Sequence, residues 1–124
     1  MLHGAELVAF VASRDLEASA RFYGDVLVFE LVESSPFASV FDAGGTTLRV
    51  TRVDEVAGAA YTVLGWKVAD LDAAISALRT RSVEFKRYDG LEQDEHGAWT
   101  APGGSRIAWF ADPDGNTLSL QQAP

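Results

Sequence analysis

The sequence contains no cysteine and only two histidines. Without thiols it can form no disulfide, no zinc–thiolate or iron–sulfur centre and no cysteine nucleophile. It also lacks any apolar run of the roughly eighteen residues that a membrane-spanning helix needs, and its N-terminus lacks the basic and apolar regions of a signal peptide. We therefore expect a cytoplasmic protein with no membrane partner.

Basic residues are scarce as well. Ten lysines and arginines stand against 18 acidic residues, which gives a net charge of −8. No basic stripe is present to replace the counterions of a phosphate backbone, so we expect no nucleic-acid partner. The acidity favours solubility, although it is also compatible with a cationic ligand. With 124 residues, 48% of them hydrophobic, the chain can bury one core, and we predict a single domain over residues 1–124.

What the sequence does contain is a long internal repeat. A strand-like run at 7–12 leads into Asp15-Leu16, and a second run at 63–68 leads into Asp70-Leu71, 55 positions later. The segment at 43–50 is echoed at 113–120. A period of this length indicates two supersecondary units. We predict a first module at about 5–53, a linker at 54–60 and a second module at about 61–121.

Each module has the pattern of one strand, one helix and three strands. For the first module, the periodicities predict strands at 6–12, 28–33, 37–42 and 46–53, with a helix at 15–27. For the second, they predict strands at 61–68, 82–88, 106–110 and 116–121, a helix from Asp70, and a polar loop at 89–104 with a short strand around Trp99. The predicted fold class is α+β, built of two tandem βαβββ modules with mixed sheets and helices outside.

Several motifs occur on this duplicated pattern in a fixed order. They are RDLEAS at 14–19, RFY at 21–23, DVL at 25–27, VADLD at 68–72 and WFADPDGN at 109–116. Together they resemble the vicinal oxygen chelate superfamily, which contains glyoxalase I, bleomycin-resistance proteins and extradiol dioxygenases. The resemblance implies sheets that curl into a cup around a small organic ligand, and a homodimer. Val28 departs from the family pattern, which usually has glycine there.

The resemblance also implies where a divalent metal would bind in a catalytic member. Counting back three residues from the aromatic residues of the two first strands leads to Leu7 and Val63, and the last strands supply Arg49 and Ser119. Leucine and valine have no lone pair, arginine is always cationic, and serine alone is a poor ligand. We therefore expect no metal and no cofactor.

An organic ligand is expected to fill the cup instead. If Leu7 and Val63 face inward, strand alternation turns Ala9 and Val11 inward and packs Phe10 and Trp66 against the helices. The predicted ligand-binding residues are Arg49, Thr51, Lys67, Trp99, Ser119 and Gln121.

The two predicted cations need a partner. Arg49 and Lys67 would bind an anionic group of a ligand, or an internal carboxylate such as Glu6, Asp42 or Glu92; Lys67 could instead extend to solvent. Trp99 is open to two interpretations, a flat contact to a planar ligand or plain packing, whereas Trp109 is expected to pack in the core.

The acidic loop at 92–96, which contains His96, is interpreted as a solvated surface, with a lid over the cup as the alternative. The functional prediction is metal-independent binding of a small organic molecule. The alternatives are a metal-dependent lyase or oxygenase of the glyoxalase/dioxygenase type, and a metal-free isomerase or lyase that uses Arg49 or Lys67.

Overall fold

The computed structural model describes all 124 residues. The chain divides into two compact units, unit 1 (Met1–Ala57) and unit 2 (Gly58–Pro124). The division falls within the predicted linker, and a single domain over the whole chain stays a prediction. No helix has the length and apolar character that crossing a membrane requires.

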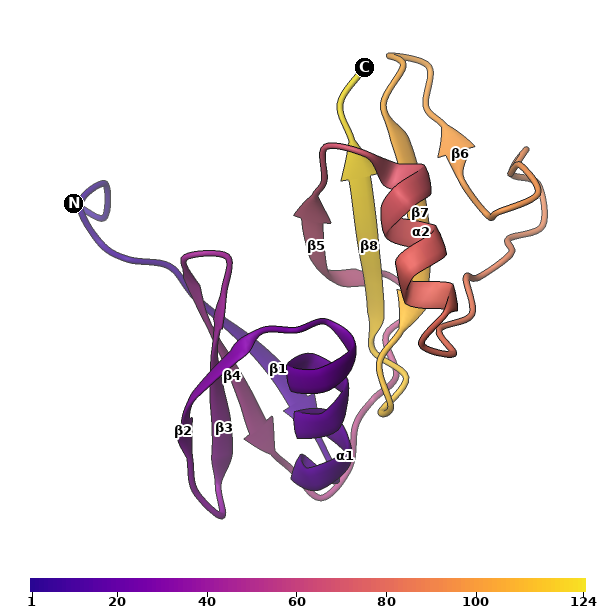
Figure 1. Ribbon diagram of the computed structural model, residues 1–124. Helices are drawn as coiled ribbons and strands as arrows, with labels where there is room; N and C mark the ends of the chain where they lie inside the picture. The colour runs from indigo at the N-terminus through magenta and orange to yellow at the C-terminus, as the bar shows by residue number, and fades with distance from the viewer. The chain divides into compact units, whose positions relative to one another are not determined.

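Unit 1 is a four-stranded sheet with a helix on one face (Figure 1). Its elements are β1 (Val8–Ser13), α1 (Leu16–Ala20), the π-helix η1 (Arg21–Val26), β2 (Glu30–Ser34), β3 (Ala38–Ala43) and β4 (Thr46–Arg52). The strand order is β1-β4-β3-β2, with β1 parallel to β4 and the other pairs antiparallel. Its core contains Tyr23, Phe41, Leu48 and Val50, which alternation and helical spacing bring together between helix and sheet.

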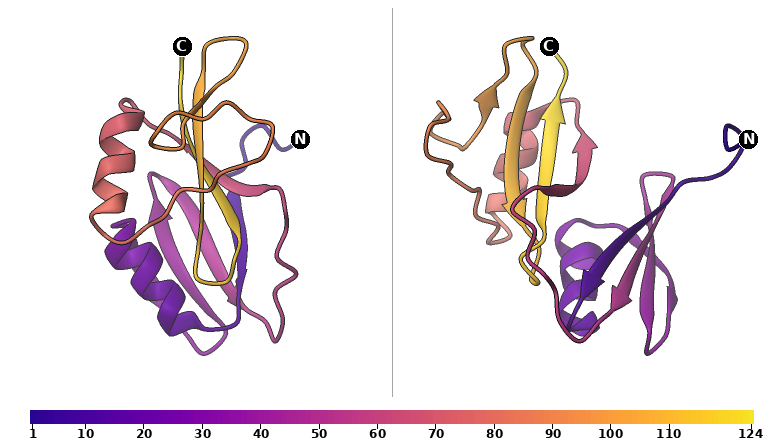
Figure 2. Two further views of the ribbon diagram at one scale, coloured as in Figure 1. Left: turned by 90° about the vertical axis from the view of Figure 1, so that its right-hand side faces the viewer. Right: turned by 180° about the vertical axis from the view of Figure 1, so that it is seen from behind.

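Unit 2 repeats this topology (Figure 2). Its elements are β5 (Thr62–Lys67), α2 (Leu71–Arg79), β6 (Trp99–Thr100), β7 (Arg106–Ala111) and β8 (Thr117–Gln122). The order is β5-β8-β7-β6, with β5 parallel to β8. The predicted tandem modules with mixed sheets are therefore confirmed. We call the face of each sheet that lies opposite its helix the open face of that unit.

The predicted strand at 82–88 is wrong. Only Phe85 bridges to Phe110 there, and the Lys86 N–H donates to the Trp109 carbonyl at 2.7 Å. Further along, the Gln93 side chain forms hydrogen bonds with backbone groups that would otherwise pair with a neighbouring strand. Its Oε1 accepts from the Tyr88 N–H at 2.7 Å, and its Nε2 donates to the Lys86 carbonyl at 2.9 Å. Side-chain hydrogen bonds from Gln93 thus take the place of strand pairing along this segment. β6 pairs with Arg106 and Ile107, at the opposite end of β7 from the Phe85 bridge.

The two Asp-Leu pairs do start the helices. Asp15 Oδ1 accepts from the N–H groups of Glu17 and Ala18, both at 3.1 Å, and Asp70 Oδ1 accepts from the Ala73 N–H at 3.0 Å. Each side chain satisfies backbone donors that have no partner within the helix. The repeated Asp-Leu pairs therefore mark the N-cap of the helix in each unit.

The first helix holds one residue more than the second. Left-handed residues follow both helices, Val28 at φ 63° and Ser82 at φ 68°, and they lie 54 positions apart whereas the capping aspartates lie 55 apart. Unit 1 absorbs the extra residue in η1, where the Leu27 N–H donates to the carbonyl of Phe22 at 2.9 Å. A turn closed five residues back contains one residue more than an α-turn.

Candidate functional site

Strand alternation decides which side chains reach the open face of unit 2. In β8, Leu118 and Leu120 are buried on the helix side, so Ser119 and Gln121 project the other way. The register aligns Gly65, Ser119 and Trp109 in one row across the sheet, and Lys67, Gln121, Ile107 and Trp99 in the next. Four of the predicted ligand-binding residues therefore share one face: Lys67, Trp99, Ser119 and Gln121.

Aromatic rings gather at one side of this face. Trp99 and Trp109 have ring centroids 6.2 Å apart at an interplanar angle of 34°, and Tyr88 meets Trp109 edge-on at 5.4 Å. Burial raises the pKa of the Tyr88 phenol above its ordinary 10.0. Trp109 is half-buried on the open face rather than in the core, which corrects the expectation for it. Trp109 and Tyr88 were not predicted from the sequence to lie at the site, although alternation from Ser119 across the β7–β8 hairpin indicates Trp109.

The floor beside these rings has little side-chain volume. Gly65 lies next to Ser119, and a Cβ at Gly65 would stand 2.6 Å from Ser119 Oγ. Glycine therefore allows the Ser119 hydroxyl to lie directly over the neighbouring backbone. Lys67 is exposed at the far side of this floor, and its ammonium group forms no ion pair or hydrogen bond within unit 2.

The open face of unit 1 carries the other predicted cation. Arg49 lies between Phe10 on β1 and Val40 on β3, and Phe10 is 63% exposed. The expectation that Phe10 packs against the helix, with Ala9 and Val11 facing away from it, is wrong. The 55-residue period aligns Phe10 with Gly65, not with Trp66, and Val11 is the residue that is buried beneath the helix. Trp66, which pairs with Leu120 in register, does face the helix as expected.

Two polar groups on this face of unit 1 have no internal partner. The Arg49 side chain makes no ion pair within unit 1, so neither Glu6 nor Asp42 neutralises it. The Thr51 hydroxyl oxygen is buried without any hydrogen bond. Such groups are costly to leave unpaired, and a ligand that bonds to them would recover that free energy.

The residues present do not fit a divalent metal ion. Neither unit brings together three His, Cys, Asp or Glu side chains in a group that could hold one. The structure also corrects the first-strand position: Leu7 lies outside β1, and Val8 is the residue in line with Val63 in the 55-residue period. Valine supplies no lone pair either, so this position still offers no donor atom for a divalent metal ion.

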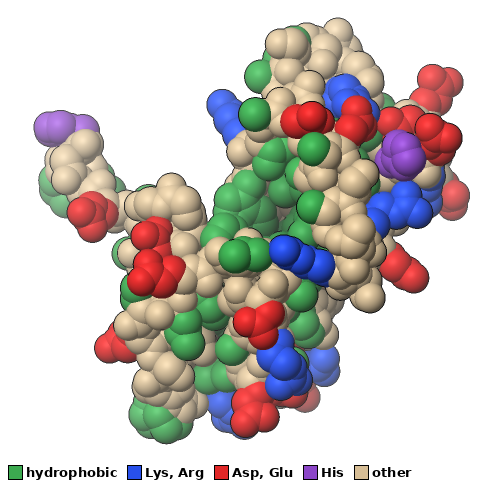
Figure 3. Space-filling view, in the orientation of Figure 1, with side chains coloured by type: hydrophobic (Ala, Val, Ile, Leu, Met, Phe, Trp, Pro, Cys, Tyr) green, Lys and Arg blue, Asp and Glu red, His purple; other side chains and the backbone are tan.

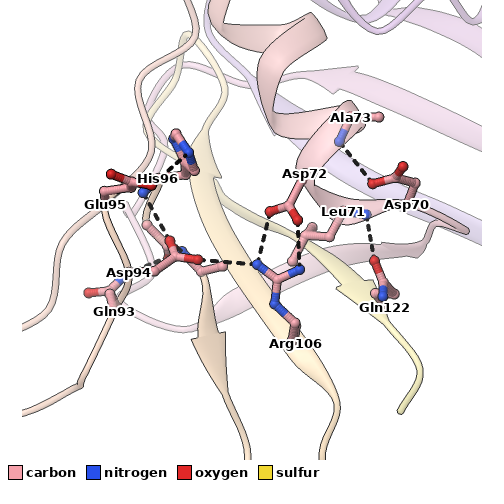
Figure 4. Close-up of polar contacts among 12 residues, drawn as sticks. Asp70, Leu71, Asp72, Ala73, Gln93, Asp94, Glu95, His96, Arg106 and Gln122 are labelled. Atoms are coloured by element: carbon pink, nitrogen blue, oxygen red, sulfur yellow. Dashed lines mark hydrogen bonds and ion pairs between the residues drawn. The ribbon is translucent and has the colours of Figure 1, made fainter.

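The acidic loop has a structural role on the helix side of unit 2 (Figure 4). Arg106 donates two hydrogen bonds to Asp72 on α2, at 2.9 and 3.1 Å, and one to Asp94 at 3.1 Å. The other carboxylate oxygen of Asp94 accepts from the N–H groups of His96 and Ala98, both at 2.9 Å. These bonds anchor the loop away from the open face, which argues against a lid.

This hydrogen-bond network shifts the pKa values of its three members. The hydrogen bonds from Arg106 hold the pKa of the Asp72 carboxyl below its ordinary 3.8, and they raise the pKa of Arg106 in return. Burial alone would raise the pKa of Asp94, but the two backbone donors and Arg106 outweigh it, so its pKa is also lowered. On the face drawn in Figure 3, acidic and basic side chains are interspersed rather than gathered into one basic patch.

Comparison with known proteins identifies the family. The model of the Glyoxalase/Bleomycin resistance protein/Dioxygenase superfamily matches residues 6–120. The chain belongs to this superfamily. No curated protein matches the sequence.

Several solved structures share the fold. The antibiotic-binding protein TnmS3 from Streptomyces sp. CB03234 is 25% identical, with a TM-score of 0.72 over 100% of this chain and 99% of that one. A lactoylglutathione lyase from Agrobacterium tumefaciens is 20% identical, with a TM-score of 0.73 over 95% and 92%. The fosfomycin resistance protein FosX from Listeria monocytogenes is 16% identical, with a TM-score of 0.75 over 95% and 92%. At their level of identity the last two support the fold alone.

Proposed function

We propose that this superfamily member binds a small organic molecule on the open face of unit 2 without a metal ion. The observation that carries the proposal is the grouping of aromatic rings, the unpaired Lys67 ammonium and the polar side chains of Ser119 and Gln121 on one face. An apolar surface with a few convergent polar groups is typical of small-molecule sites. Neither unit brings three His, Cys, Asp or Glu side chains together, which favours binding over metal-dependent chemistry.

The likeness to TnmS3 suggests what binding would achieve. That protein is described as antibiotic-binding, and its likeness extends over the whole of this chain. By analogy, we propose sequestration of an antibiotic or a compound of similar size. A homodimer and a cytoplasmic location remain predictions from the family resemblance and the composition.

A metal-free isomerase or lyase is the second candidate. The unpaired Arg49 guanidinium and the buried Thr51 hydroxyl favour it, because together they could stabilise an oxyanion on unit 1. Turnover that survives chelation and is lost in Arg49→Ala would support this candidate over simple binding.

A thermal-shift screen tests the binding proposal. Untagged protein is screened against antibiotics and aromatic metabolites. A compound at a hundred times its dissociation constant adds about 2.7 kcal/mol to the free energy of unfolding, which is a rise of several degrees in Tm. Hits should lose most of their shift in Trp109→Leu and keep it in Trp66→Phe, whose ring faces α2 instead. Hits that are indifferent to Trp109→Leu would place the ligand elsewhere.

A further inference from the structure

We infer that the ligand of unit 2 is a flat aromatic acid, with its rings against Trp99 and Trp109 and its anionic group at Lys67. This inference rests on the proposed function and adds the chemical class and the orientation of the ligand. It follows from the order of side chains across the sheet: β6 and β7 supply the indoles, β8 supplies small polar groups, and β5 supplies the cation.

The aromatic side of the face is held in place before a ligand arrives. Trp109 contacts the Trp99 ring at 6.2 Å and the edge of Tyr88 at 5.4 Å. Both indoles keep part of their surface accessible. Because the rings are already packed against each other, binding immobilises few rotatable bonds. Flat π-systems gain from offset or edge contacts with such rings beyond the apolar area they bury.

The floor between the rings and the cation suits a flat molecule. Gly65 has no side chain and Ser119 has a short one, while Gln121 and Ile107 in the neighbouring row add a flexible polar and an apolar side chain. From β7 to β5 the floor spans two strand spacings, about 10 Å. A fused two-ring system that starts at Trp109 can cross this distance with its plane along the sheet and end near Lys67.

The charge at the end of the floor selects an acid. The Lys67 side chain forms no ion pair or hydrogen bond within unit 2, although acidic residues outnumber basic ones by 18 to 10 in the chain. An ammonium without a partner at the rim of an apolar surface attracts a carboxylate, sulfonate or phenolate oxygen. A cationic group placed at the Lys67 ammonium would be repelled.

The test compares three probes by NMR titration of ¹⁵N-labelled protein. The probes are 2-naphthoate, the uncharged 2-naphthamide with the same rings, and cyclohexanecarboxylate with the charge but no flat ring. The three tryptophan indole N–H signals, assigned from single Trp→Phe variants, show where each probe binds. We expect 2-naphthoate to shift the Trp99 and Trp109 signals and leave Trp66 unmoved, with an affinity about fivefold above that of either other probe.

Two charge variants complete the test. Lys67→Met should abolish the preference for naphthoate over naphthamide. The matched Arg79→Met, on α2 at the opposite face, should keep it. Equal binding of the two naphthalenes by the native protein, an unchanged preference in Lys67→Met, or no saturable shift at millimolar probe would each overturn the inference.

The proposed function can fail separately from this inference. A screening hit that depends on Trp109 but is cationic or non-aromatic would uphold the binding function and refute the ligand class. The binding function and the ligand class both fail only if no compound loses its Tm shift in Trp109→Leu.

Discussion

Thr51 is a local weakness of unit 1, because its hydroxyl oxygen is buried without a hydrogen-bond partner. An unsatisfied buried hydroxyl costs about 1–3 kcal/mol relative to one that is bonded. Native proteins contain few such groups, so each one calls for an explanation. The position of Thr51 on the same face as Arg49 is consistent with a role in contacting a ligand.

Replacing Thr51 by the nearly isosteric valine should therefore stabilise the protein. We expect Thr51→Val to raise the free energy of unfolding by about 1 kcal/mol, or Tm by about 4 °C, in thermal or urea unfolding. Thr47→Val is the matched control, because Thr47 lies on the same strand and face but is exposed. Its effect should stay within about 0.5 kcal/mol. A Thr51→Val variant less stable than the native protein would show that the hydroxyl is satisfied.

Val28 is a second residue whose side chain is unfavourable for its position in the fold. Its φ of 63° lies in the left-handed region, which β-branched residues rarely adopt. Glycine would remove about 1–2 kcal/mol of steric strain and lose about 0.5–1 kcal/mol through the entropy of the unfolded chain. We expect Val28→Gly to raise Tm by a few degrees, and Val28→Ala, which keeps a Cβ, to gain less. If glycine and alanine gave the same result, strain at this residue would not be the cause.

At the scale of elements, Arg106 joins three parts of unit 2 that are distant in sequence. It connects β7 to the first turn of α2 through Asp72 and to the acidic loop through Asp94. This network explains why a loop rich in charge is ordered. The same three groups make the stability of unit 2 depend on pH.

The direction of that dependence follows from the lowered pKa values of Asp72 and Asp94. Each carboxyl stabilises the fold above its unfolded pKa of about 3.8, and this contribution is lost as the pH falls through the lower folded value. Asp94→Asn should reduce the free energy of unfolding at pH 7 by about 1 kcal/mol. The difference from the native protein should shrink between pH 4 and pH 2 in urea unfolding. A difference that stays constant over this range would contradict the network.

At the scale of the whole molecule, the repeat predicted most of the architecture from sequence. The Asp-Leu pairs located both helix starts, and the hairpin turns located the central strands of each sheet. The absence of a strand at 82–88 could not be predicted, because the side chain of Gln93 bonds to the backbone there through contacts made only in the folded chain.

The candidate site was predicted in part. Alternation placed Lys67, Ser119 and Gln121 on one face, as the structure has them. The face of Phe10 was misassigned, because the two aromatic residues of the first strands are 56 positions apart and the repeat is 55. The ring contacts of Tyr88 are tertiary, so no local pattern reveals them.

The most direct test of the central claim, ligand binding without a metal ion, is the thermal-shift screen repeated on protein dialysed against a chelator. We expect the same hits with the same Tm increases before and after dialysis, and again after a divalent metal is restored. Hits that vanish on chelation and return with added metal would contradict it.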